Sequence, residues 1–92
     1  MRRQLRIVNR LGLHMRAANV FADAASRYAS TVQVSRGALR VNGKSIMGLM
    51  MLAAPIGSDI TIEIAGPDEE QAMTELARIV ETGFGENGDA SL

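Results

Sequence analysis

The sequence contains a single histidine, His14, within the stretch RLGLHMRAANV. Imidazole titrates close to neutral pH and can act as a nucleophile, a general base or a metal ligand. Gly12 precedes the histidine, and apolar residues at helical spacing follow from Met15 onward. This pattern predicts a loop that ends at His14 and a helix that begins at Met15, with His14 as the N-cap.

The start of such a helix suits the binding of an anion. Its first N–H groups have no partner within the helix, and the helix dipole adds about half a positive charge there. We expect the amides of Met15, Arg16 and Ala17 to point past the imidazole, and the Arg16 guanidinium to reach the same place. The positive field favours a neutral, nucleophilic His14, so the pattern predicts a covalent phosphoryl carrier.

Two other interpretations of His14 remain open at this level. The imidazole could serve only as a helix cap, or it could be a general base, although no acid or nucleophile lies near it in the sequence. Other chemistry is easier to exclude. The absence of cysteine rules out disulfides, thiolate catalysis and cysteine-ligated metals, and one histidine makes a His-rich metal site implausible. We therefore expect no metal and no cofactor.

The length of the chain indicates one small domain, residues 1–92, and its charge limits the classes of partner it can bind. Ten basic and ten acidic residues balance, and only 3% of the residues are aromatic. Both facts argue against a nucleic-acid-binding α+β domain, the weakest functional hypothesis. No apolar run approaches the roughly 18–20 residues of a membrane span, and the first residues lack the apolar h-region of a signal peptide. We expect a soluble, cytoplasmic monomer without membrane insertion.

The hydrophobic pattern changes between period two and helical period along the chain. Strands are predicted over 2–8, 31–36, 39–41 and 59–65, and helices over 15–28, 45–52 and 68–82. This order, β-α-β-β-α-β-α, predicts an α+β fold: an open-faced two-layer sandwich whose four-stranded antiparallel sheet is covered on one face by three helices. Asp68 and Gln71 resemble a capping box, and residues 85–92 are predicted to form a flexible tail.

The segment GKSIMGLMML predicts a short helix with Ser45 as its N-cap. Its apolar residues extend nearly all round the helix, so they cannot all face one sheet. Exposed apolar clusters often mark interaction surfaces, and methionine can pack against several partners. The alternative is that Met50 and Met51 only fill gaps in the core.

The motifs GLHMRAA and NGKSIMGLMML together resemble the HPr family, the histidine-containing phosphocarrier proteins of the bacterial sugar phosphotransferase system (PTS). The likeness extends over nearly the whole chain. The segments NRLGLH and GFGEN are also similar to NPr, the nitrogen-related branch of the family. The resemblance implies an open-faced sandwich of four antiparallel strands and three helices, and a carrier rather than an enzyme.

The resemblance further implies that His14 accepts a phosphoryl group on Nδ1 from phosphorylated Enzyme I, which phosphoenolpyruvate has charged. The group would pass to an Enzyme II A-type protein or a nitrogen-PTS acceptor, and Arg16 would assist the phosphate. Ile46, Met47 and Met50 would form a docking patch beside the histidine. The family usually has proline after the arginine. Here Ala17 loses the fixed φ angle of proline but adds one amide donor.

The same resemblance implies a regulatory role for Ser45. In HPr proteins of many bacteria, the matching serine is phosphorylated by an ATP-dependent HPr kinase/phosphorylase. A phosphate adds about −1.5 to −2 charges, which the helix start tolerates and an apolar docking face does not. A second hypothesis is a regulatory protein-binding module of this fold. It would bind a transcriptional regulator or an enzyme through the Ser45 and Met47 surface without relaying phosphoryl groups.

Overall fold

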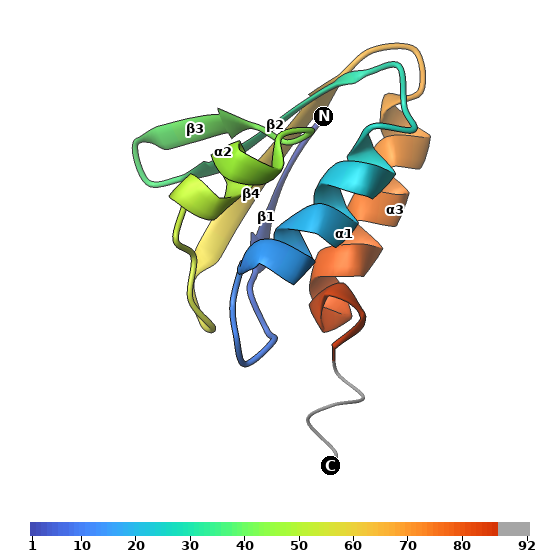
Figure 1. Cartoon of the computed structure of the whole chain (residues 1–92). Helices are drawn as coiled ribbons and strands as arrows, with labels where there is room; N and C mark the ends of the chain where they lie inside the picture. The colour runs from blue at the N-terminus through green and yellow to red at the C-terminus, as the bar shows by residue number, and fades with distance from the viewer. Residues whose placement is uncertain (87–92) are drawn as a thin grey trace.

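The computed structural model describes residues 1–86, in which one sheet is covered by helices (Figure 1). The strands are β1 (Arg2–Arg6), β2 (Thr31–Arg36), β3 (Leu39–Asn42) and β4 (Asp59–Ala65). The helices are α1 (Met15–Ala25), α2 (Ile46–Met51) and α3 (Glu69–Glu81), followed by a 3-10 turn, η1 (Gly83–Gly85). The predicted order β-α-β-β-α-β-α is confirmed. Residues 87–92, most of the predicted tail, lie outside the described part of the chain.

The four strands form a single antiparallel sheet in the order β1-β4-β2-β3. In the interior strand β4, Ile60 lies opposite Leu5 of β1, and Ile64 lies opposite Val32 of β2. Alternate side chains of each strand point to opposite faces, so these apolar residues are buried while their neighbours stay more exposed. The predicted open-faced sandwich, with helices on one face of the sheet only, is confirmed.

The core lies between the sheet and the helices. Phe21 of α1, Ile62 of β4 and Leu76 of α3 are each less than 2% exposed. Figure 1 shows α1 and α3 side by side over the sheet, whereas α2 is a short helix near β3 that buries only Leu49 among its residues. Most apolar side chains of α2 therefore remain in contact with solvent. Within residues 1–86, no helix is both long and apolar enough to cross a lipid bilayer.

The helix ends depart from the sequence prediction at two places. α1 ends at Ala25, about one turn earlier than its apolar pattern predicts. Asp68 makes no side-chain capping bond, so the predicted capping box with Gln71 is wrong. Its carboxylate instead accepts hydrogen bonds from the Ser30 hydroxyl and from the amides of Ala29 and Ser30. These hydrogen bonds hold the pKa of the Asp68 carboxyl below its ordinary value, and the bond from the Ser30 hydroxyl has the largest effect.

Candidate functional site

His14 caps the N-terminus of α1 and remains partly exposed. Its backbone is extended, with φ −87° and ψ −175°, and its carbonyl accepts the Ala18 amide at 2.8 Å. The preceding turn requires Gly12, whose φ is +68° and where a Cβ atom would lie 2.5 Å from the Ala54 carbonyl oxygen. The Leu13 amide donates to that same oxygen at 2.9 Å. The loop is thereby held against the segment after α2, and the His14 side chain is 27% exposed.

The helix start brings a ring nitrogen and free amides together, and Arg16 in the first turn carries an exposed guanidinium. The Arg16 amide donates to Nδ1 of His14 across 3.3 Å, which is long for such a bond. Within residues 1–86, the amides of Met15 and Ala17 have no hydrogen-bond acceptor. The exposed Arg16 guanidinium likewise makes no ion pair there. The four consecutive residues that the sequence assigned to phosphoryl binding thus form the N-cap and first turn of α1.

The structure also places a carboxylate at His14 that the sequence analysis missed. Glu86 is 72 residues further along the chain, and its Oε2 lies 2.6 Å from Nε2 of His14. An ionised carboxylate can only accept, so Nε2 of a neutral ring carries the hydrogen and donates it. Nδ1, which accepts the Arg16 amide, then carries the lone pair. Both contacts select the same tautomer, in which Nδ1 is the nucleophilic atom.

Glu86 reaches His14 because the chain turns sharply after α3. Gly83 has φ +71°, and Phe84 also lies in the left-handed region, at φ +57°, with its ring buried. Burial of the ring offsets the backbone strain of about 1 kcal/mol. The Glu86 amide closes the turn on the Gly83 carbonyl at 2.9 Å. Residues 85 and 86, the first two of the predicted flexible tail, therefore belong to a defined turn, from which Glu86 contacts Asn9 and His14.

Asn9, in the loop after β1, holds the Glu86 carboxylate from its other side. The Asn9 side-chain nitrogen, Nδ2, donates to Oε1 of Glu86 at 2.9 Å and to the Gly12 carbonyl at 2.8 Å. A reversed amide would point its oxygen at these two acceptors, so the amide orientation is fixed. The Asn9 Oδ1 atom is buried and has no partner in the described residues. Sequence reasoning gave Asn9 no role, because one asparagine in a loop carries no signal of its own.

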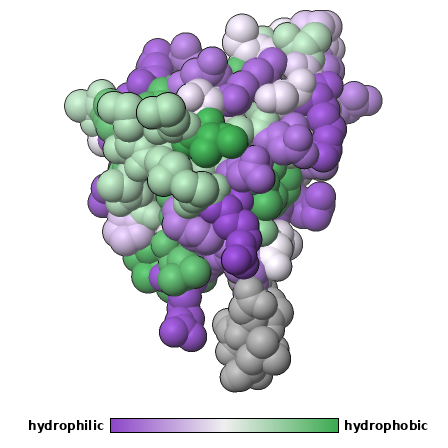
Figure 2. Space-filling view, viewed as in Figure 1, coloured by the Kyte–Doolittle hydropathy of each residue, from purple (hydrophilic) through white to green (hydrophobic). Residues whose placement is uncertain are grey.

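The short helix α2 presents an apolar surface. Ser45 caps it as predicted, since its Oγ accepts the Gly48 amide at 3.0 Å. Met47 is 78% exposed, and Ile46 and Met50 are 37% and 38% exposed. We call Ile46, Met47 and Met50 the α2 surface, and Figure 2 shows hydrophobic side chains gathered on this side of the molecule. Other exposed apolar residues, among them Leu11, Met15 and Met51, were not assigned to docking. The alternative that Met51 fills the core is wrong, because it is 66% exposed.

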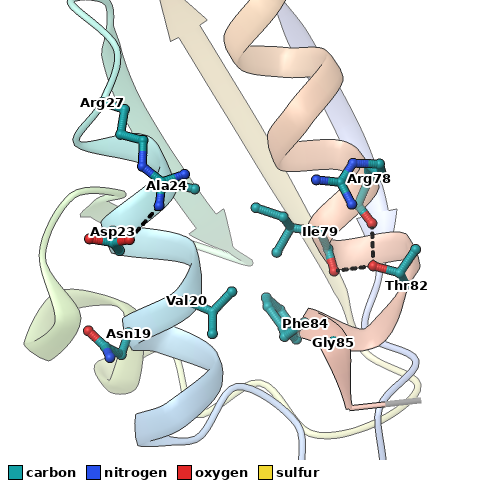
Figure 3. Close-up of a pocket in the computed structure, with 10 residues that line it drawn as sticks. All are labelled: Asn19, Val20, Asp23, Ala24, Arg27, Arg78, Ile79, Thr82, Phe84 and Gly85. Carbon is teal, nitrogen blue, oxygen red and sulfur yellow. Dashed lines mark hydrogen bonds and ion pairs between the residues drawn. The ribbon is translucent and has the colours of Figure 1, made fainter. Parts of the chain in front are cut away.

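A separate groove runs between α1 and α3 (Figure 3). Val20, Ile79 and Phe84 provide its apolar walls, and Arg27 and Arg78 line its polar rim. Val20 is 36% exposed, although it belongs to the apolar pattern of α1. None of the residues assigned to phosphoryl chemistry lines this groove. Among residues 1–86, no group of three or more acidic or histidine side chains is arranged to hold a metal ion.

Comparison with known proteins identifies the family. A family model described as the PTS HPr component phosphorylation site matches residues 1–82. The chain belongs to the HPr family. Phosphocarrier protein HPr of Neisseria meningitidis serogroup A is 49% identical over 86 residues, which cover 94% of this chain and 97% of that protein. The crystal structure of an HPr from Thermoanaerobacter tengcongensis has a TM-score of 0.88 at 36% identity and covers 92% of this chain and 96% of its own. A structure of the HPr dimer from the same organism has a TM-score of 0.74 at 38% identity and covers 87% of this chain and 92% of its own.

The comparisons confirm the resemblance seen in the sequence. HPr proteins are phosphocarriers of the phosphotransferase system rather than enzymes, and their fold is the open-faced sandwich described above. The residues matched by the family model include His14 and Ser45 but end before Glu86. The contact between His14 and Glu86 is therefore a feature of this structure that the family match itself does not contain.

Proposed function

We propose that this chain carries a phosphoryl group on Nδ1 of His14 and receives it from phosphorylated Enzyme I. The supporting observation is the contact pattern of the imidazole: Nε2 donates to Glu86, and Nδ1 presents a lone pair at the open N-terminus of α1. In the transfer, this lone pair attacks the phosphorus atom held by Enzyme I. The bond from phosphorus to Enzyme I breaks as the Nδ1–P bond forms.

The phosphoryl oxygens would be bound by groups that lack other partners. As the Nδ1–P bond forms, the weak bond from the Arg16 amide to Nδ1 must open. That amide then faces the phosphoryl group together with the amides of Met15 and Ala17. The exposed Arg16 guanidinium can turn toward the dianion and donate two hydrogen bonds.

The α2 surface would dock the donor and the acceptor in turn. Its methionines can adapt to partners of different shape, and it adjoins α1, whose first turn holds His14. The acceptor would be an Enzyme II A-type protein or a nitrogen-PTS protein. These partners imply a cytoplasmic location. The monomeric state stays a prediction that light scattering tests, since a related HPr has been solved as a dimer.

Ser45 is proposed as a site of regulatory phosphorylation by an HPr kinase/phosphorylase. Its hydroxyl lies at the N-cap of α2, directly before Ile46 and close to Met47. A phosphate there would suit the helix start but would place about two negative charges beside an apolar docking face. Incubation with the kinase and ATP should add one phosphoryl group to the wild type and none to Ser45→Ala. A gain of the same size in Ser45→Ala would reject this assignment.

Incubation with phosphoenolpyruvate and the cognate Enzyme I tests the main proposal. The intact mass should increase by one phosphoryl group, which is lost in acid and retained in base. The gain should disappear in His14→Ala. No gain in the wild type, or a gain that persists in His14→Ala, would reject phosphoryl transfer through this residue. Stable binding of a regulator without such a gain would instead support the binding-module hypothesis.

A further inference from the structure

We propose that Asn9 is a positioning residue that acts through Glu86 on the phosphoryl chemistry of His14. Asn9 holds the Glu86 carboxylate against Nε2, and this carboxylate fixes the ring tautomer and stabilises the cation formed when Nδ1 is phosphorylated. The inference deepens the proposed function and rests on it.

The first argument is the cost of the buried Asn9 side chain. It is 3% exposed, and its Oδ1 atom has no partner in the described residues. A buried, unpaired carbonyl oxygen destabilises the fold, and such costs concentrate at functional sites. The same side chain donates two hydrogen bonds from its nitrogen, one to the Gly12 carbonyl in the His14 loop and one to Glu86. Asn9 thus links the loop that carries the imidazole to the turn that carries the carboxylate.

The second argument concerns charge. When the Nδ1 lone pair bonds to phosphorus, Nε2 keeps its hydrogen and the ring becomes positively charged. The Glu86 side chain is only 9% exposed and lies 2.6 Å away, so it is well placed to balance this charge. When the group leaves, the electron pair of the N–P bond returns to Nδ1 and the ring is neutral again. The hydrogen stays on Nε2 throughout, and the step transfers no proton to Glu86.

The third argument is the choice of an amide. An arginine or lysine at position 9 would neutralise the Glu86 carboxylate, whereas the amide of Asn9 holds it by hydrogen bonding and leaves its charge for the ring. Within residues 1–86, His14 is the only titratable partner of Glu86. The full negative charge therefore remains available to the phosphorylated imidazole.

Nitrogen NMR of the unphosphorylated protein at about pH 8.5, where imidazole is ordinarily neutral, tests the positioning directly. The wild type should show one tautomer, with the hydrogen on Nε2 and a slowly exchanging N–H proton. Glu86→Ala should lose that proton signal and show ring nitrogen shifts averaged between two tautomers. Asn9→Ala should change in the same direction. The double variant should have the same ring nitrogen shifts as Glu86→Ala alone, because the proposed effect of Asn9 on the tautomer is exerted through Glu86. Asn19→Ala, on the exposed face of α1, is the matched control and should resemble the wild type.

Rates of phosphorylation by Enzyme I give the second readout. Glu86→Gln keeps an acceptor for Nε2 but removes the charge, so it should retain the tautomer and react about tenfold more slowly. If Asn9→Ala does not fold, Asn9→Leu has a similar size, removes the donor without adding a charge, and gives the same test. Wild-type ring shifts and rates in the Glu86 and Asn9 variants would overturn the inference while phosphoryl transfer stands. Failure of the wild type to accept phosphoryl groups would overturn both the proposed function and the inference drawn from it.

Discussion

The His14 site and the α2 surface belong to neighbouring helices, but they are built in opposite ways. His14 is oriented by a polar contact from a distant part of the chain, the turn at Glu86, whose carboxylate Asn9 holds. The α2 surface depends on local sequence: a short helix, capped by Ser45, has more apolar residues than one sheet face can cover. A reactive atom needs fixed geometry, whereas a surface for several partners needs adaptable side chains.

The largest effect is expected when the loop that positions His14 is disrupted. Gly12→Ala places a Cβ atom 2.5 Å from a backbone oxygen at φ +68°, so we expect the free energy of unfolding to fall by about 3 kcal/mol. Gly37→Ala is the matched control, because its φ is +60° but no atom lies within 4 Å. Its free energy of unfolding should fall by only about 1 kcal/mol. Urea unfolding followed by circular dichroism measures both, and equal losses would show that the contact with Ala54 is unimportant.

A charge on the α2 surface should impair docking while His14 stays intact. Met47→Glu should raise the KM for phosphorylation by Enzyme I about tenfold, because burying an unpaired carboxylate at an interface is costly. Gln4→Glu adds the same charge on the exposed β1 strand and is the control. Steady-state phosphorylation assays should show a normal KM for the control. A normal KM for Met47→Glu would contradict the docking assignment.

Two substitutions of Ser45, the N-cap of α2, separate the stability of this helix from docking at the α2 surface. Ser45→Ala removes the bond to the Gly48 amide and should lower the free energy of unfolding by about 1 kcal/mol. Ser45→Asp keeps a good N-cap and should retain stability, yet it should weaken docking of Enzyme I through its charge. Denaturant unfolding and titration calorimetry with Enzyme I measure the two effects. Docking as tight for Ser45→Asp as for Ser45→Ala would count against electrostatic control by Ser45.

The smallest effect is expected at Ala17, where the family usually has proline. In the described residues the Ala17 amide has no acceptor, so Ala17→Pro breaks no existing bond. It should raise the free energy of unfolding by about 0.4–1 kcal/mol. It also removes one donor to the phosphoryl group, so spontaneous loss of that group should become about threefold faster. A decrease in stability, or an unchanged lifetime of the phosphorylated form, would contradict this account of Ala17.

Local signals explain what the sequence could predict. The strand and helix order follows from hydrophobic periodicity, and the caps at His14 and Ser45 follow from where apolar helical spacing begins. The contact of Glu86 with His14 could not be predicted, because it depends on how a left-handed turn at Phe84 redirects the chain after α3. Asp68 failed as a cap for a similar reason, since Ser30, brought close by the fold, competes for its carboxylate.

The most direct test of the central claim is NMR of the phosphorylated protein that detects coupling between phosphorus and the imidazole nitrogens. The structure predicts coupling to Nδ1 of His14, with the hydrogen retained on Nε2 beside Glu86. Coupling to Nε2, or a phosphoryl group on any residue other than His14, would contradict the account.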